Sequence, residues 1–388
     1  MILPSARGMA RLAWNHPRYV EELLIKKLNL LSRYRWIKEH ADQDDRVPPP
    51  LIYKLVLTYK CNLRCSFCYE WGEAGWCIGE APNKIAKEVP WEVIEKVLAD
   101  AASRHSSFIL SGGEPLLYSR FRDLSIALQK AGRVAITCTN GMLLDRYLDV
   151  SSGNPYLTYL ISLDGLAPQN DQLRGRGVYR RVTENIRRLK AVKKPPYIAA
   201  QFTIRPENVG VMHDFCQEMV DIGVDWILLN LCWFITESQA RAYEDFMRTH
   251  FGISPVSHLG YLLPYELDKD EFVRQYRRIQ NRTWPIQISC YLKNPEDIYA
   301  FVDTPDVPPG NNFCYKQWIR MDITPDGTVS PCILYPDILV GDLRSQSVSD
   351  VWNSGAAAKF RQVRRKECLP VCSKCDVLYL YDAGRRAL

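Results

Sequence analysis

The 388-residue chain is 47% apolar, which is enough for a large buried core, and its length predicts one large domain with a smaller one beside it. The net charge of +6 is modest, and Lys and Arg are spread along the chain, so the concentrated basic stripe of a nucleic-acid-binding protein is missing. No apolar run approaches the roughly 18–20 residues that cross a bilayer, and the N-terminus lacks the pattern of a signal peptide. We therefore expect a cytoplasmic protein with no transmembrane segment and no nucleic-acid partner.

Residues 1–50 are predicted to form an N-terminal amphipathic helix and a linker. Apolar residues recur at helical spacing between residues 17 and 40, and Pro17 suits a first helical turn. We expect this apolar face to pack against the main domain, and a membrane surface or a partner helix is the alternative. The face consists of Val20, Leu23, Leu24, Leu28, Leu31 and Tyr34.

Strands and helices alternate from residue 51 onward. Six segments rich in β-branched or aromatic residues are predicted strands: Ile52–Tyr59, Ser107–Leu110, Val134–Thr139, Tyr159–Leu163, Tyr197–Ile204 and Asp225–Phe234. Six β–α units in series predict a parallel sheet with helices outside it, and they are too few to close an eight-stranded barrel. The expected fold is therefore α/β: a partial (β/α)6 TIM-like barrel over residues 51–240, with the chemistry at the C-terminal ends of the strands. Residues 241–310 are expected to connect this core to the tail and to face the substrate.

A group of three cysteines follows the first predicted strand: Cys61, Cys65 and Cys68. Cysteine clusters in the cytosol more often bind metal or act in catalysis than form disulfides. Three thiolates within eight residues can hold one face of an iron–sulfur cube and leave its fourth iron open. A zinc site is the alternative, but it favours paired CxxC arms or His ligands, and neither lies beside this group.

This CxxxCxxC pattern, with Phe67 just before its last Cys, resembles the radical S-adenosylmethionine (SAM) superfamily. The resemblance covers roughly residues 51–240 and includes Gly112-Gly113-Glu114 after the second strand, Thr139-Asn140-Gly141 after the third and Ser162-Leu163-Asp164-Gly165 after the fourth. It implies that the three cysteines hold a SAM-binding 4Fe–4S cluster, that Glu114 receives the SAM amino group, and that Ser162 and Arg174 bind its carboxylate. The full set of implied cofactor-binding residues is Phe67, Gly112, Gly113, Glu114, Asn140, Ser162, Asp164 and Arg174.

A second group of five cysteines lies in the tail, residues 311–388, which is predicted to be a small C-terminal iron–sulfur domain. Their order resembles a SPASM-type extension of radical SAM enzymes, whose full form carries seven cysteines and two auxiliary clusters. Five cysteines imply one auxiliary 4Fe–4S cluster, with a four-thiolate zinc knuckle as the alternative. The preferred ligands are Cys314, Cys332, Cys372 and Cys375, with Cys368 as a spare or substitute.

The resemblance implies reductive cleavage of SAM to a 5′-deoxyadenosyl radical that abstracts a hydrogen atom from a substrate. Two substrate classes stay open: a peptide or protein, or a small molecule oxidised or rearranged in natural-product or cofactor biosynthesis. A non-enzymatic iron–sulfur or zinc-binding protein is a third option, which the intact SAM motifs disfavour. Expected partners are the substrate and a one-electron donor such as flavodoxin or ferredoxin. A separate leader-binding protein is a further option, because the first fifty residues are too short for such a domain. No catalytic acid or base is identified.

Overall fold

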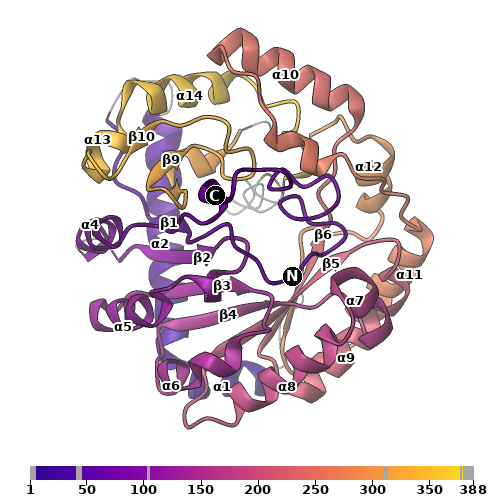
Figure 1. Ribbon diagram of the computed structural model, residues 1–388. Helices are drawn as coiled ribbons and strands as arrows, with labels where there is room; N and C mark the ends of the chain where they lie inside the picture. Colours follow the sequence, from indigo (N-terminus) through magenta and orange to yellow (C-terminus); the bar gives the residue numbers. More distant parts are fainter. Residues whose placement is uncertain (1–5, 41–45, 103–104, 309–312, 376–377, 379–388) are drawn as a thin grey trace.

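The computed structural model describes residues 6–40, 46–102, 105–308, 313–375 and 378. A single open sheet of ten strands within these residues forms the frame, in the order β10-β9-β8-β1-β2-β3-β4-β5-β6-β7 (Figure 1). The strands are β1 (Ile52–Val56), β2 (Ser107–Ser111), β3 (Ala135–Thr139), β4 (Leu157–Ser162), β5 (Tyr197–Ile204), β6 (Trp226–Leu231), β7 (Gln287–Cys290), β8 (Arg320–Ile323), β9 (Thr328–Ser330) and β10 (Gly341–Asp342).

The convex outer face of this curved sheet is covered by helices α4 (Trp91–Ala102), α5 (Phe121–Ala131), α8 (Val178–Lys190), α9 (Met212–Ile222) and α11 (Lys269–Gln280) (Figure 1). Valines, leucines and phenylalanines on their inner sides form one continuous core with the outward-facing strand residues. The other helices are α1 (Ala6–Asn15), α2 (Pro17–His40), α3 (Pro82–Ile85), α6 (Leu148–Ser151), α7 (Ala167–Arg174), α10 (Glu237–Phe251), α12 (Asp297–Asp303), α13 (Val348–Trp352) and α14 (Gly355–Lys366).

The predicted partial barrel is confirmed by β1 to β6, which are parallel and neighbour one another in chain order. Two further parallel strands were not predicted. β7, from the segment 241–310, pairs with β6, and β8, from the tail, pairs with β1. The sheet thus runs from the barrel into both later segments, and the domain boundaries near residues 240 and 310 stay predictions.

Alternate strand residues face the inside of the barrel, which we call the lumen. Along β2, the outward-facing Phe108 and Leu110 are buried, whereas the alternate residues Ile109 and Ser111 keep part of their surface exposed. The same alternation appears along β3, where Ile136 and Cys138 are the partly exposed residues. Side chains on alternate positions of a strand face opposite sides of the sheet. The partly exposed set therefore faces the lumen, where Ile136 and Cys138 pack against a small inner cluster of Leu160, Ala199 and Leu228.

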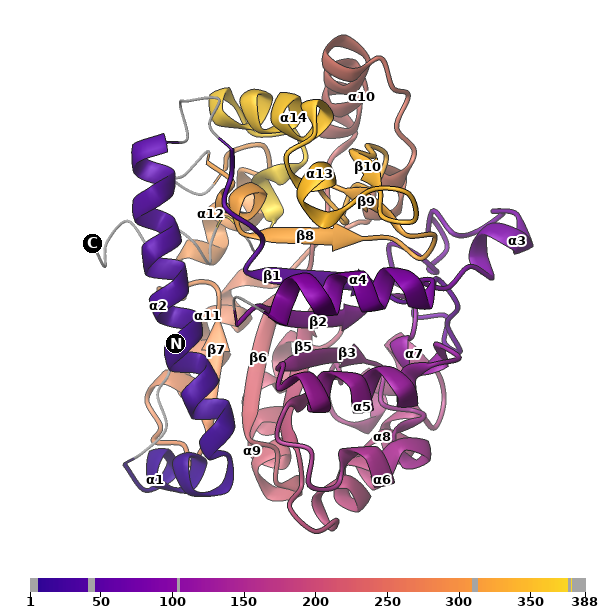
Figure 2. The same cartoon turned by 90° about the vertical axis from the view of Figure 1, so that its left-hand side faces the viewer.

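Helix α2 lies across the N-terminal ends of the strands, on the side opposite the cysteine loop (Figure 2). Tyr19 stacks on Tyr197 with ring centroids 4.0 Å apart. Arg33 donates to the carbonyl of Pro49 at 2.7 Å and to that of Trp318. The helix thus supplies donors and rings to strand ends and loops. Part of the linker that follows, residues 41–45, lies outside the described residues.

The predicted span of α2 is confirmed, and so is the burial of Tyr34, but the predicted packing face was wrong for Leu23, Leu24 and Leu28. Leu24 and Leu28 are 60% and 67% exposed, and Leu23 is exposed as well. The buried residues of the helix are Tyr19, Arg33, Tyr34 and Ile37. Within the described residues, no helix has the length and apolar character needed to span a membrane.

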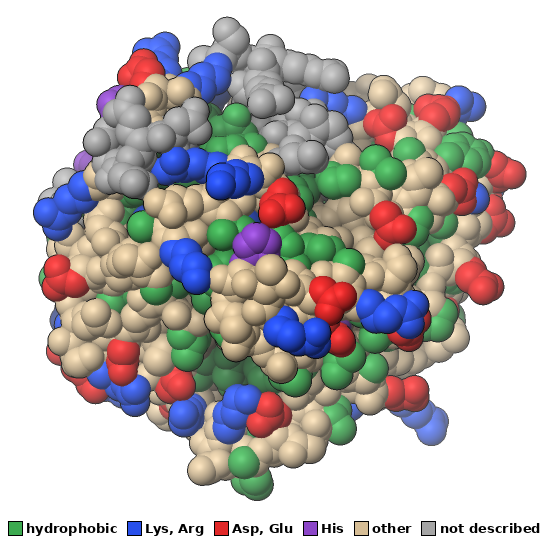
Figure 3. Space-filling model, turned by 90° about the horizontal axis from the view of Figure 1, so that it is seen from above, with side chains coloured by type: hydrophobic (Ala, Val, Ile, Leu, Met, Phe, Trp, Pro, Cys, Tyr) green, Lys and Arg blue, Asp and Glu red, His purple; other side chains and the backbone are tan. Residues whose placement is uncertain are grey.

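The face of the molecule that carries α10 and α14 shows acidic and basic side chains interspersed, with apolar side chains between them (Figure 3).

Helix α14 begins at an N-cap, Ser354, whose side chain accepts a hydrogen bond from the amide of Ala357. It ends with three basic residues, which suits the negative end of the helix dipole. This helix borders the cysteines of the tail.

Candidate active site

The loop that follows β1 carries the first cysteine group at the C-terminal mouth of the barrel. The amide of Cys68 donates to the carbonyl of Cys65 at 3.1 Å, and the amide of Trp71 lies 3.4 Å from the Cys68 Sγ. Cys65 interacts electrostatically with both Cys61 and Cys68, so the three sulfurs lie near one another. The structure brings together the three residues that the CxxxCxxC spacing singled out.

The burial of these thiols fits a site built for a positively charged group. Burial raises the pKa of Cys61 and of Cys68 to about 12. Metal ligands must be deprotonated, so the thiolates need charge from the group they hold. Among the described residues, no three His, Cys, Asp or Glu side chains converge closely enough for one metal ion. A cluster spreads its thiolates over separate irons, and three cysteines on one loop suit that arrangement.

Gly112 and Gly113 let the end of β2 approach the start of the cysteine loop. A Cβ on Gly112 would lie 2.3 Å from the carbonyl oxygen of Thr58, and one on Gly113 would lie 2.5 Å from that of Tyr59. Gly112 also has a φ of +146°, which residues with a side chain rarely adopt. Close backbone packing therefore requires both glycines, whatever ligand they also meet.

Glu114 is fully buried and ties the ends of β2 and β3 together. Its Oε1 accepts from the Thr139 hydroxyl at 2.7 Å and from the amide of Leu116 at 3.0 Å. Its Oε2 accepts from the amide of Asn140 at 2.8 Å. Burial raises the pKa of Glu114 to about 7, although these hydrogen bonds oppose the rise. Oε2 can accept one more donor, and a contact with an ammonium group would form there.

Asn140 connects the end of β3 to the cysteine loop. Its Nδ2 donates to Asn62 Oδ1 at 2.8 Å and lies 3.9 Å from the Cys61 Sγ. Its Oδ1 accepts from the amide of Met142 at 3.0 Å. Asn140 therefore positions the loop rather than reaching freely into the lumen.

Asp164 and Arg174 form a buried ion pair beside the cysteine loop. Arg174 donates from Nε to Asp164 Oδ2 at 2.6 Å, and its Nη1 lies 3.8 Å from the Cys65 Sγ. Asp164 Oδ1 accepts from the amide of Thr203 at 2.7 Å. Burial opposes the charge, yet Asp164 and Cys65 raise the pKa of Arg174 above its ordinary value. Arg174 is thus not a solvated loop residue, and its Nη2 has no hydrogen-bond partner within the described residues.

Phe67 and Ser162 border this ion pair. The Phe67 ring centroid lies 5.6 Å from the Arg174 guanidinium carbon. Ser162 ends β4, pairs with Gln201 of β5 and keeps part of its surface exposed. Because Ile161 before it packs in the outer core, Ser162 faces the lumen.

Two side chains at the site were missed by the sequence analysis. Arg205, just after β5, is buried, lies over the Phe67 ring at 5.2 Å and points Nη1 at the Cys232 Sγ, 3.4 Å away. Glu70 is buried next to the cysteine loop, and burial raises its pKa to about 7. Neither belongs to a recognisable motif, although Arg205 does follow a predicted strand at the end where active-site residues gather.

The tail gathers its cysteines in a second place. Three of the five thiols interact electrostatically with the Tyr335 hydroxyl and three with the Arg364 guanidinium, and Cys372 is in both sets. Cys314 and Cys332 lie at least 36 residues before Cys368, Cys372 and Cys375, so the fold and not local spacing assembles the group. The gathered cysteines are Cys314, Cys332, Cys368, Cys372 and Cys375.

The fold is an open parallel barrel with three thiols at its mouth and a buried Asp–Arg pair beside them, and the tail gathers five further cysteines. These features are those of an iron–sulfur enzyme with a partial barrel. Residues 55–219 match the Radical SAM superfamily, and residues 314–376 match the SPASM iron–sulfur cluster-binding domain. The chain belongs to the radical SAM superfamily, carries a SPASM domain and uses iron–sulfur clusters and SAM as cofactors.

Relatives with assigned names cover most of the chain. The sporulation killing factor maturation protein SkfB of Bacillus subtilis is 24% identical over 317 residues, which are 81% of this chain and 67% of that protein. A probable GTP 3′,8-cyclase of Methanosarcina mazei is 25% identical over 297 residues, 74% of this chain and 78% of that one.

Among solved structures, Streptococcus suis SuiB superposes with a TM-score of 0.61 at 16% identity, over 91% of this chain and 76% of that chain. The enzyme anSMEcpe with bound AdoMet superposes with a TM-score of 0.54 at 16% identity, over 87% of this chain and 98% of that chain. At these identities the superpositions establish the fold alone.

Proposed function

We propose that this protein is a maturase that modifies a peptide or protein by radical chemistry. The observation that carries the proposal is the match to the maturation protein SkfB, which extends over 81% of this chain. A solved structure of SuiB holds the precursor peptide SuiA, and its fold is similar to this one at a TM-score of 0.59.

In this proposal, Cys61, Cys65 and Cys68 hold the first 4Fe–4S cluster. When bound and reduced, that cluster supplies the electron that splits SAM into methionine and a 5′-deoxyadenosyl radical. The protein's part is to bind and orient SAM. Arg174 has an unused Nη2 beside Cys65 for the SAM carboxylate, and the planar guanidinium suits a carboxylate well.

The other predicted residues complete this pocket. Glu114 Oε2 takes the SAM ammonium, and Ser162 adds a hydroxyl to the carboxylate contact. Phe67 shields the ion pair from water. Gly112, Gly113, Asn140 and Asp164 hold the surrounding backbone and the arginine in place.

The tail holds one auxiliary 4Fe–4S cluster in this proposal, on Cys314, Cys332, Cys372 and Cys375. Cys368 lies within hydrogen-bond reach of Cys372 and is the substitute ligand. A cytoplasmic flavodoxin or ferredoxin supplies electrons, and a separate protein binds the leader of the precursor peptide.

The test is a reaction with the natural precursor. The genes beside the one that encodes this protein would be searched for a short open reading frame. The peptide that it encodes would be incubated anaerobically with the purified enzyme, SAM and dithionite. We expect a peptide that has lost two hydrogen atoms, together with an equal amount of 5′-deoxyadenosine, and no product from the Cys65→Ala variant. An unchanged peptide in the presence of active SAM cleavage would contradict the maturase assignment.

Small-molecule chemistry is the second candidate, because the match to the probable GTP 3′,8-cyclase covers 78% of that protein. The same anaerobic reaction with GTP in place of the peptide separates the two. GTP-dependent formation of 5′-deoxyadenosine would favour this second candidate.

A further inference from the structure

Arg364 is a buried cation beside the cysteines of the tail. It lies in the last turns of α14 and is 1% exposed. Its Nη2 lies 3.4 Å from the Cys368 Sγ, and its Nη1 donates to the carbonyl of Glu367. No carboxylate within the described residues forms an ion pair with it, so its charge is not neutralised by an acidic side chain.

The surroundings of Arg364 are rich in sulfur. Cys372, Cys314 and Cys368 all interact electrostatically with its guanidinium. The only other buried cation that interacts with these thiols among the described residues, Lys316, is paired with Asp322 at 2.8 Å. Arg364 is therefore a positive charge beside this cysteine group that no acidic side chain among the described residues neutralises.

We propose that Arg364 raises the reduction potential of the auxiliary cluster. Reduction adds one electron to the cluster and makes the site more negative. A fixed cation that lies 3.4 Å from the Cys368 Sγ and also interacts electrostatically with Cys314 and Cys372 stabilises the reduced state more than the oxidised state. Its burial keeps water and salt from screening it. Hydrogen bonds to the sulfurs and buried charge are two of the means by which proteins set cluster potentials. Arg suits this role because its charge does not titrate.

A raised potential has a direct use in the proposed reaction. After hydrogen abstraction, the substrate radical loses one electron and one proton to give the oxidised product. An auxiliary cluster held by the tail cysteines would accept that electron, and a higher potential would make the transfer more favourable. This inference rests on the proposed auxiliary cluster but not on the identity of the substrate.

The experiment is a redox titration of anaerobically reconstituted holoenzyme with dithionite, followed by electron paramagnetic resonance. We expect Arg364→Gln to lower the midpoint potential of the auxiliary cluster and to leave that of the first cluster unchanged. Iron analysis before the titration tests the auxiliary cluster separately from the role of Arg364, because zinc in the tail would refute the cluster itself. A full auxiliary cluster with an unchanged midpoint in Arg364→Gln would overturn the role of Arg364 alone.

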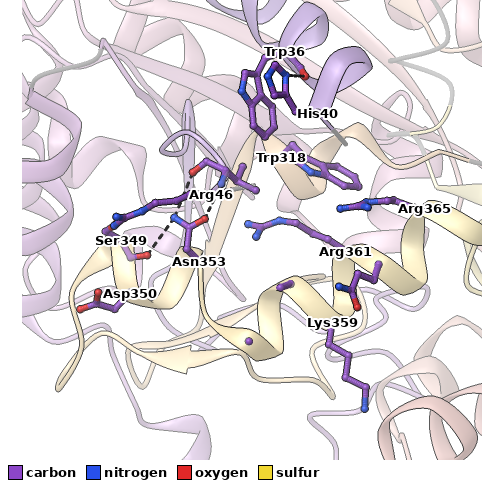
Figure 4. A pocket seen from close by; sticks show the side chains of 14 residues that line it. Trp36, His40, Arg46, Trp318, Ser349, Asp350, Asn353, Lys359, Arg361 and Arg365 are labelled. Atoms are coloured by element: carbon purple, nitrogen blue, oxygen red, sulfur yellow. Dashed lines mark hydrogen bonds between the residues drawn. The ribbon is translucent and has the colours of Figure 1, made fainter. Parts of the chain in front are cut away.

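Arg361 provides a matched control on the same helix. It is also buried, at 5% exposure, and donates to the main-chain carbonyls of Gln317 and Trp352. It points into a cavity of about 730 Å³ between α2 and α14, next to Trp318 and Asn353 (Figure 4). Arg361→Gln removes one buried charge without a sulfur contact, so we expect a much smaller change in the auxiliary midpoint. An equal change in both variants would count against a specific role for Arg364.

A second variant covers the case in which Arg364→Gln fails to hold the cluster. Arg364→His is charged below its pKa, which is ordinarily about 6.5, and neutral above it. We expect its auxiliary midpoint to fall between about pH 6 and pH 8 by more than that of the wild type. An equal pH dependence, or loss of the cluster at both pH values in folded protein, would overturn the proposal in favour of a purely structural role.

Discussion

Arg174 donates from Nε to Asp164 at 2.6 Å while its Nη1 faces the Cys65 Sγ at 3.8 Å, so a single side chain joins the fourth strand of the barrel to the cysteine loop. Both partners of this ion pair are buried. The arginine therefore has a structural bond on one edge of its guanidinium and an unused nitrogen on the other. This division allows the two roles to be measured separately.

Arg174→Lys should weaken SAM binding by about tenfold or more, because the ammonium lacks the planar fork that binds a carboxylate. Calorimetric titration of SAM into protein with intact clusters measures the effect. Iron content should stay normal. A titration that matched the wild type would assign the SAM carboxylate to another residue.

Arg174→Ala should lower the free energy of unfolding by about 3–5 kcal/mol, because it leaves Asp164 buried without its partner. The double variant Arg174→Met, Asp164→Asn should recover much of this loss. Urea unfolding of the cluster-free protein makes the comparison. Equal stability of Arg174→Ala and wild type would show that the pair does not form in solution.

The exposed leucines of α2 give a prediction about packing. Leu24→Ala and Leu28→Ala should each change the free energy of unfolding by no more than about 0.5 kcal/mol. Ile37→Ala, on the buried side of the same helix, should cost about 2–5 kcal/mol. Urea unfolding measures all three. A large loss at Leu24 or Leu28 would mean that another surface covers this face.

Asp322 should make part of the protein's stability dependent on pH. Burial opposes its charge, but Arg320 at 2.7 Å and Lys316 at 2.8 Å hold its pKa well below the ordinary value. A lowered pKa contributes stability above the unfolded value of about 3.9, and this contribution is lost as the pH falls through and below it. The stability difference between wild type and Asp322→Asn should therefore shrink as the pH falls from about 6 to about 3. A constant difference would contradict the ion pairs.

Cluster content tests the two cysteine groups. Wild-type protein purified without oxygen should hold about eight irons and eight sulfides from two 4Fe–4S clusters, and alanine at Cys61, Cys65 and Cys68 together should leave about four. Cys368→Ser should keep both clusters if Cys314, Cys332, Cys372 and Cys375 are the ligands. Loss of four irons in Cys368→Ser would make Cys368 a ligand instead.

The sequence was sufficient for the barrel and for the motifs at its mouth, because both are local. The β–α alternation predicted β1 to β6, and the CxxxCxxC and GGE patterns lie directly after strands. β7 and β8 were missed because each has only four residues, too few for a reliable alternation. Their pairing with β6 and β1 depends on contacts far apart in the chain.

Other features depended on the tertiary fold. The helical spacing of apolar residues in α2 predicted the helix and the burial of Tyr34. Leu23, Leu24 and Leu28 on the same face are exposed, because periodicity does not say what lies opposite. Arg205 and Arg364 belong to no motif and lie beside sulfur only because β5 and α14 bring them there. Glu114 also depends on the tertiary fold. The motif indicated a contact with a ligand, whereas the Glu114 carboxylate accepts three hydrogen bonds from the protein and so joins the ends of two strands.

The pairing of β8 with β1 makes the tail the edge protection of the barrel's first strand. Residues Ile52–Leu55 pair in parallel with residues Arg320–Ile323, and Lys54 lies opposite Asp322 in this ladder. A chain that ended before residue 311 would leave this side of β1 with unpaired amides and carbonyls, which invite pairing with other molecules. The strand that leads into the SAM-cluster loop would then become an aggregation-prone edge. Shortened versions of this protein are therefore poor tools for studying the first cluster alone, and the two iron–sulfur sites are best produced and purified as one unit.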